Sequence, residues 1–301
     1  MAKNKEQVSA VRRARHGGIL SVLFAVISIL WISPMLIVFL NSFKRKAFIF
    51  RYPFGFSSKP LSDGWDKFME GAKQIFCGTL NYKNGLKTTN FFSCFGNSLF
   101  ITVFSVMAII LCCSMCAWYI VRVHSAFSKF MYTMCLFSMI VPFQMVMFTL
   151  SKFANMLHLS NPAGIIVVYL GFGAGLAVFM FTGFVKGISI EIEEAAMIDG
   201  CNPIQTFFLV VFPILKPTVV TVAILQAMWI WNDYLLPSLV LNINRYKTIP
   251  IAVQYLKQSH GQIDWGAMMA VLVLAILPIV VFYIACQKYI IEGVLAGAVK
   301  G

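Results

Sequence analysis

Six long apolar stretches with almost no charged residues constrain this 301-residue chain more than any other feature. A helix needs about 20 apolar residues to cross a hydrocarbon core about 30 Å thick. The stretches therefore predict six membrane-spanning helices, at residues 17–43, about 91–121, 130–151, 162–185, 217–241 and 265–287. Composition agrees, because only 12% of the residues are charged, against roughly 25% in an average globular protein. We expect an all-α membrane protein.

Composition and missing motifs exclude several function classes. The net charge of +13 would favour nucleic acid in a soluble domain. Here the Lys and Arg residues lie mostly between apolar stretches, where they face lipid headgroups and water. The sequence holds no G-x-x-x-x-G-K-[ST] phosphate loop, no G-x-S-x-G nucleophile elbow and no H-E-x-x-H metal motif. We therefore expect no nucleic-acid partner, no bound metal and no enzymatic activity in this chain.

Outside the predicted spans lie, among other segments, an N-terminal tail at 1–16, a long connection at 44–90 and a C-terminal tail at 288–301. Counted over all segments, Lys and Arg do not decide the orientation. The positive-inside rule applies best to short loops, and without the 44–90 connection it favours a cytoplasmic N-terminus. An even number of spans then places both termini in the cytoplasm and 44–90 outside, with a short amphipathic helix near 66–76.

The connection at 186–216 carries the clearest local signals. Ser189 is a good N-cap, and Glu191, Glu193 and Glu194 place negative charge near the start of a helix. Gly200 suits a left-handed C-terminal cap, and Asn202 with Pro203 begins a second helix. Two readings remain: the glutamates anchor a basic protein partner, or the segment is a connector that packs only on its own bundle.

The same segment resembles the EAA loop of ABC-importer permeases. The family pattern is Glu-Ala-Ala, three residues, Gly, nine residues and Ile-x-Leu-Pro. It is matched in spacing by Glu194, Ala195, Ala196, Gly200, Val210, Phe212 and Pro213. Further matches are similar to the carbohydrate-uptake, maltose-type branch: Asn97-Ser98-Leu99, Met197-Ile198-Asp199, Trp231-Asn232-Asp233 and the tail Gly297–Gly301. Ser189 departs from the pattern, since many relatives have proline there.

This resemblance implies the type I importer permease fold and a role as the transmembrane permease subunit of an ATP-driven importer for a sugar. It implies a multi-pass protein of the bacterial cell membrane that pairs with a second permease, two ATPase subunits and an extracytoplasmic sugar-binding protein. ATP and Mg would be bound by the ATPase subunits, with no cofactor in this chain. The implied ATPase-coupling residues are Glu191, Glu194, Ala195, Ala196, Asp199, Gly200 and Pro213, and the implied tail contacts to the ATPase are Val299, Lys300 and Gly301.

Asp233 is the only carboxylate inside a predicted span, and such residues are usually functional. Trp229, Asn232 and Asp233 share one helix face by their i, i+3, i+4 spacing. Aromatic, amide and carboxylate groups suit a sugar, so a substrate pathway is one reading and an architectural or gating role is the other. The alternative function is an ion-coupled secondary transporter acting without an ATPase, for which Asp233 is the main support.

The eight cysteines predict no metal site, because Cys112, Cys113 and Cys116 lie on an apolar helix without a nearby histidine. Buried free thiols behave as small hydrophobic groups. Cys77 and Cys94 fall on the expected outer side, where a disulfide can persist. Either a bridge between these two or two free thiols fits the sequence.

Overall fold

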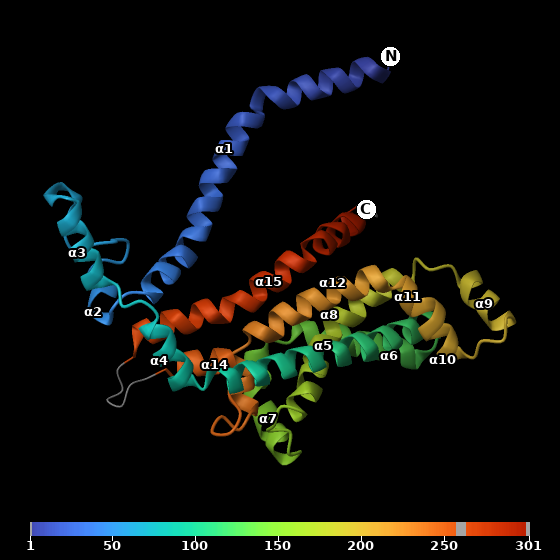
Figure 1. Ribbon diagram of the computed structural model, residues 1–301. Coiled ribbons are helices and arrows are strands. Elements are labelled where there is room, and N and C mark those ends of the chain that lie inside the picture. Colours follow the sequence, from blue (N-terminus) through green and yellow to red (C-terminus); the bar gives the residue numbers. More distant parts are fainter. Residues whose placement is uncertain (1, 257–262, 299–301) are drawn as a thin grey trace. The chain divides into compact units, whose positions relative to one another are not determined.

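The computed structural model describes residues 2–256 and 263–298, which are helical apart from connecting segments and an isolated antiparallel bridge between Lys44 and Phe76 (Figure 1). The chain divides into two compact units. The first comprises residues 1–88 and 256–274, and the second comprises 89–255 and 275–301.

Helices of the first unit lie mostly near the N-terminus: α1 (Ala2–Ser42), α2 (Lys46–Ile49), η1 (Leu61–Asp63), α3 (Trp65–Ile75) and α4 (Leu80–Thr89), together with the beginning of α15 (Trp265–Ala298). The second unit contains α5 (Phe91–Arg122), α6 (Ala126–Ile140), α7 (Phe143–Met156), α8 (Gly164–Val185), α9 (Ile190–Ile198), α10 (Pro203–Gln205), η2 (Thr206–Val211), α11 (Phe212–Ile214), α12 (Lys216–Asn232), α13 (Leu235–Val240), α14 (Ile249–Gln254) and the rest of α15.

Four helical stretches in the described part of the chain are long and apolar enough to cross a bilayer unaided. They are Leu20–Ser42, Phe91–Arg122, Gly164–Val185 and Trp265–Lys288. Two further pairs of helices reach that length only together, across a sharp bend, and raise the number of spans to six if each pair counts as one. The protein is therefore an all-α membrane protein.

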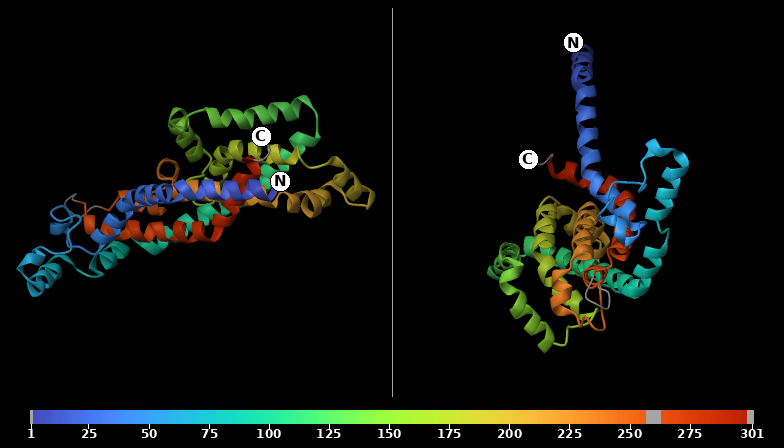
Figure 2. Two further views of the ribbon diagram at one scale, coloured as in Figure 1. Left: turned by 90° about the horizontal axis from the view of Figure 1, so that it is seen from above. Right: turned by 90° about the vertical axis from the view of Figure 1, so that its left-hand side faces the viewer.

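The segment predicted as one helix over 130–151 is broken. The chain bends by 109° between α6 and α7 (Figure 2, left). Pro142 lacks an N–H and disfavours helical geometry in the residue before it. Val141 accordingly adopts an extended conformation, with ψ at 117°, and α7 begins directly after the proline.

The segment predicted as one helix over 217–241 is also interrupted. Helix α12 ends at Asn232, Asp233 is extended with ψ at 123°, and α13 begins at Leu235. On its other side, α12 is bent by 76° from the helical segment Pro203–Ile214. The apolar run therefore holds two helices that are separated at its one carboxylate.

In the first unit, a buried lysine fixes the chain after α1. The Lys44 ammonium is fully buried and donates hydrogen bonds to the carbonyl oxygens of Tyr52 (2.8 Å) and Pro53 (3.0 Å). Burial lowers the pKa of this group. Asn81 of α4 donates to the carbonyl oxygens of Ser42 and Lys44, both at 2.8 Å. These bonds hold the end of α1 against α4.

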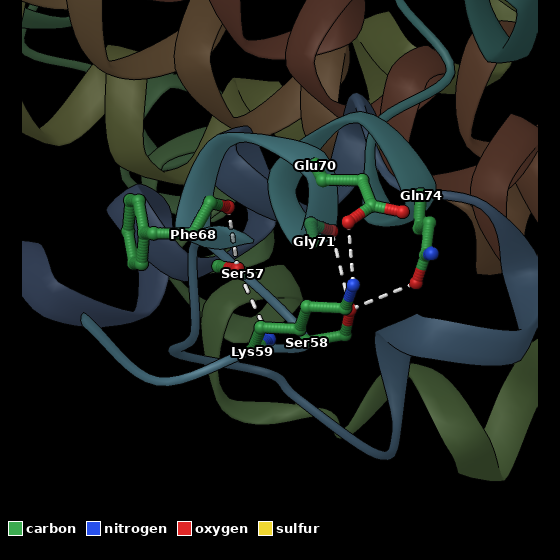
Figure 3. Close-up of polar contacts among 7 residues, drawn as sticks. All are labelled: Ser57, Ser58, Lys59, Phe68, Glu70, Gly71 and Gln74. Atoms are coloured by element: carbon green, nitrogen blue, oxygen red, sulfur yellow. Dashed lines mark hydrogen bonds and ion pairs between the residues drawn. The ribbon is translucent and has the colours of Figure 1, made fainter. Parts of the chain in front are cut away.

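Helix α3, which the sequence predicts as an amphipathic helix near 66–76, is held by the segment that precedes it (Figure 3). Ser57 Oγ donates to the Phe68 carbonyl oxygen at 2.7 Å, and Lys59 forms an ion pair with Glu70. Gly71 permits the close approach, because a Cβ there would lie 2.8 Å from the Lys59 backbone nitrogen.

The core of the second unit is built around α8. Tyr169, Ala177 and Phe181 of this helix are completely buried, and α8 packs along α5, α6 and α12. Helix α8 is apolar on all sides, so it buries side chains against several neighbours, as expected of a helix in the middle of a bundle. This bundle supports the α9–α11 segment at one end (Figure 1).

Candidate functional site

The loop between α8 and α12 folds as its capping residues predict. Ser189 caps α9 by accepting a hydrogen bond from the Glu191 backbone N–H. Gly200 ends the helix in the left-handed region, at φ +90°. Asn202 then forms a capping box with Gln205. The two short helices therefore meet at a glycine corner, which confirms this part of the prediction.

The second half of the loop differs from a simple short helix. After α10 the backbone widens into a π-helical stretch, η2, and continues through α11 before the bend into α12. In η2 the Phe212 N–H bonds to the Phe207 carbonyl, five residues back. Pro213 has no N–H to bond in the usual α-helical pattern, and such local widening is common at functional sites.

Most of the predicted coupling residues lie on the surface of this loop. Exposed are Glu191, Glu194, Ala195, Asp199, Gly200 and Pro213, whereas Ala196 is buried. Apolar side chains surround the acidic ones, and Ile198 (85% exposed), Ile204 and Leu209 face outward from the described chain. The loop thus presents a mixed acidic and apolar surface.

Glu193 corrects the prediction that all three glutamates of α9 offer charge to a partner. Its carboxylate is buried, at 3% exposure. Arg122 at the end of α5 forms an ion pair with it, with Nη2 at 2.7 Å from Oε1, and Trp118 Nε1 donates to Oε2 at 2.9 Å. The sequence analysis did not identify Trp118 and Arg122. Two signals pointed to the ion pair: an arginine at the end of a 32-residue apolar helix and a third glutamate on α9.

The predicted substrate-pathway residues separate into two surroundings. Asp233 Oδ1 accepts hydrogen bonds from the backbone N–H groups of Leu235 (2.9 Å) and Leu236 (3.3 Å), and its Oδ2 accepts one from the Tyr169 hydroxyl at 3.0 Å. Trp229 packs edge-on against the Tyr169 ring, with centroids 5.5 Å apart. Asn232 is exposed and donates to the Met228 carbonyl.

This arrangement gives Asp233 a structural task, because its carboxylate begins α13 in the way that an N-cap side chain does. Trp229 and Asn232 remain exposed beside it. The architectural reading of Asp233 therefore has direct contacts to support it, while aromatic and amide groups next to it stay open to a ligand.

Two further predictions concern a pair of cysteines and the C-terminal tail. Cys77 and Cys94 are both free thiols, so the structure does not form the bridge. Each thiol lies instead near a backbone carbonyl oxygen, that of Phe43 (3.3 Å) for Cys77 and that of Thr89 (3.2 Å) for Cys94. The tail residues Val299, Lys300 and Gly301 lie outside the described residues.

Comparison with known families decides the identity of this fold and loop. Residues 109–295, more than half of the chain, match the family described as binding-protein-dependent transport system inner membrane components. The chain belongs to this family. The resemblance noted in the sequence is thereby confirmed, and the α8–α12 loop lies within the matched region.

Named relatives of this transport component are permeases. The probable starch degradation products transport system permease AmyC of Thermoanaerobacterium thermosulfurigenes is 38% identical over 94% of this chain and 96% of that protein. The multiple sugar-binding transport system permease MsmG of Streptococcus mutans is 32% identical over 93% and 95%. The arabinooligosaccharides transport system permease AraQ of Bacillus subtilis is 26% identical over the whole of both chains.

Solved structures share the fold of this transport component. A bacterial ABC transporter involved in the import of the acidic polysaccharide alginate matches with a TM-score of 0.71, at 20% identity, over 92% of this chain and 97% of that one. The alginate transporter in complex with a pentasaccharide-bound periplasmic protein matches with a TM-score of 0.56, at 15% identity. The fold is therefore that of a type I ABC importer permease.

Proposed function

We propose that this chain is the transmembrane permease subunit of an ATP-driven bacterial importer for a sugar, with both termini in the cytoplasm. The observation that carries the proposal is the α9–α11 loop. Its exposed surface is acidic and apolar, and the buried ion pair between Glu193 and Arg122 holds it against α5. The names of the relatives, which transport starch degradation products, multiple sugars or arabinooligosaccharides, support the sugar.

The loop has the chemistry of a docking element for an ATPase subunit. Glu194 and Glu191 offer charge to a basic groove, and the charges lie beside apolar anchors such as Ile198. Apolar contacts supply affinity in such an interface, while complementary charge selects the partner and its orientation. An acidic helix is poorly suited to the anionic cytoplasmic leaflet, so a protein is the better partner.

The remaining partners follow from the same role. Two ATPase subunits bind ATP and Mg, and this chain holds no cofactor. A second permease and an extracytoplasmic sugar-binding protein complete the importer. The apolar stretch Leu20–Ser42 of α1 suits the lipid bilayer, because a helix that crosses the hydrocarbon core needs about 20 apolar residues. The tail residues 299–301 provide a further contact to the ATPase.

Sugar passes, in this proposal, beside the break between α12 and α13. Trp229 and Asn232 are exposed there and offer an aromatic face and an amide. Alternating access by rigid-body motion of the permease pair then exposes these groups to each side in turn. Asp233 and Tyr169 hold the shape of the break rather than the sugar.

Charge reversal at Glu194 tests the docking role. Glu194→Lys should weaken co-purification of the ATPase at least about tenfold, because juxtaposed like charges cost several kcal/mol, and sugar uptake should fall with it. Glu194→Gln should weaken binding less. Asp66→Lys, a charge reversal on exposed α3, is the matched control and should bind the ATPase normally. Normal uptake and normal ATPase binding by Glu194→Lys would contradict the proposal.

A further inference from the structure

Helix α5 is fixed to α9 by an unusually complete set of side-chain bonds. Both oxygens of the buried Glu193 carboxylate accept hydrogen bonds from α5: Oε2 from Trp118 Nε1 at 2.9 Å, and Oε1 from Arg122 Nε and Nη2 at 2.9 and 2.7 Å. Trp118 and Arg122 are four residues apart and so share one face of α5. A buried pair of this kind holds a fixed geometry, because breaking it leaves an uncompensated charge.

The end of α5 also contacts the loop on both sides of α9. Arg122 Nη2 donates to the Ile188 carbonyl oxygen at 3.0 Å, ahead of α9. The Trp118 ring packs against buried Phe207 of η2, with centroids 5.5 Å apart. One helix end therefore holds the chain before, within and after the docking helix.

The opposite end of α5 is bonded to a different segment. Asn97 Nδ2 donates to the Lys247 carbonyl oxygen at 3.0 Å, and the buried Ser98 Oγ accepts from the Ile249 N–H at 2.9 Å. These bonds join residues about 150 positions apart in the chain. They secure the segment 242–249, which leads into α14.

This segment borders a polar hollow of about 730 Å³ within the second unit. Phe100 of α5 lines it together with Asn242, Arg245 and Tyr246 from the secured segment. Asn155 near the end of α7 and Asn161 from the connection between α7 and α8 also line it. A movement of 242–249 would therefore change the shape of this hollow.

We propose that α5 is a strut that carries displacement of the α9 loop to the segment 242–249 and its polar hollow. Glu193 is the positioning residue that fixes α9 to the strut. The inference rests on the proposed function, since an ATPase must move the loop. Rigid elements with bonded ends transmit displacement between distant sites, and α5 runs unbroken over 32 residues, about 48 Å at 1.5 Å per residue.

Neighbouring elements are less suited to this task. Helix α12 is bent by 76° from the loop side and broken again after Asn232. Helix α8 reaches α9 through a non-helical link at 186–189. The strut therefore depends on the side chains at the two ends of α5 rather than on chain connectivity.

Variants at each end of α5 test the strut in the complete importer, reconstituted with its ATPase, second permease and binding protein. Glu193→Gln removes the charge and keeps the shape, and Trp118→Phe removes the indole N–H and keeps an aromatic side chain. Ser98→Ala removes one of the two hydrogen bonds at the opposite end of α5. Tyr119→Phe and Ser93→Ala are matched controls on exposed faces of α5. The measurements are ATPase co-purification, ATP hydrolysis and sugar transported per ATP hydrolysed.

The strut predicts that all three variants keep the ATPase bound and hydrolyse ATP, while sugar transported per ATP falls about tenfold, within the usual range of coupling between distant sites. The controls should keep the wild-type ratio. A wild-type ratio in the variants at either end overturns the inference, and so does a loss of ATPase binding that accounts for the loss of transport. Failure of the proposed function is distinct, because the wild-type chain would then bind no ATPase.

Discussion

At the scale of single residues, Glu193 and Glu194 show how neighbouring identical side chains take opposite tasks. Glu194 is exposed, and Glu193 is buried against Trp118 and Arg122. Successive helical residues point about 100° apart, since an α-helix has 3.6 residues per turn. One glutamate therefore faces the bundle and the other faces outward, so their substitutions should have different effects.

The free energy of unfolding should differ between variants of the buried Glu193 pair and variants of the exposed Glu194. Arg122→Met leaves the buried Glu193 charge unpaired, which typically costs about 3–5 kcal/mol. Adding Glu193→Leu removes that charge and should recover much of the loss. Glu194→Gln should leave stability within about 0.5 kcal/mol, as exposed substitutions do. Thermal unfolding of the detergent-solubilised protein measures this order. A double variant less stable than Arg122→Met alone would contradict the assignment of Glu193 as a buried ion-pair partner.

At the scale of elements, the glycines of α8 show what close packing requires. The four-residue spacing of Gly171 and Gly175 is typical of close helix contacts in membranes. Of these two glycines, Gly175 makes a close helix contact, because a Cβ there would lie 2.7 Å from the Cys135 carbonyl oxygen of α6. A Cβ on Gly171 would meet no atom of the described chain within 4 Å. Gly173, on another face, packs closely against Ile109 of α5.

A matched pair of substitutions on α8 follows. Gly175→Ala should destabilise the protein by about 1–3 kcal/mol, the usual cost of overpacking, because the neighbour includes rigid backbone. Gly171→Ala should be neutral or stabilising by up to about 1 kcal/mol, the difference in helix propensity. The melting temperature of each purified variant checks this. Equal destabilisation by both would show that α6 does not pack on α8 as described.

Element-level patterns account for how much the sequence could predict. Apolar length identified the four helical stretches that are long enough to cross a bilayer unaided, and the cap residues Ser189, Gly200 and Asn202 identified where the short helices of the loop begin and end, because both signals are local. The 109° bend at Pro142 divides a segment that was predicted as one helix, because local sequence does not determine how far the chain bends at a proline. The Glu193–Arg122 pair joins residues 71 positions apart, and such pairings depend on the tertiary fold.

At the scale of the whole molecule, the question is which energy source moves the sugar. An ion-coupled transporter needs an intramembrane group that binds and releases the ion, and Asp233 is the sequence's only candidate inside a predicted span. In the structure this carboxylate accepts bonds from the Leu235 and Leu236 N–H groups and from Tyr169. These acceptor roles belong to the fold and need no change of charge.

The substitution Asp233→Asn distinguishes transport driven by ATP from transport driven by an ion gradient. Its amide oxygen can accept the same backbone bonds, and its NH₂ group can donate to the Tyr169 hydroxyl, so Asp233→Asn should keep most of the transport rate. Asp233→Ala loses the cap, a loss worth about 0.5–2 kcal/mol, and should transport less. Initial sugar uptake into proteoliposomes holding the complete importer should require ATP and persist when ionophores collapse the ion gradients. Uptake that stops with the gradients and is abolished by Asp233→Asn would instead establish ion-coupled transport, since asparagine keeps the hydrogen bonds and removes only the titratable charge.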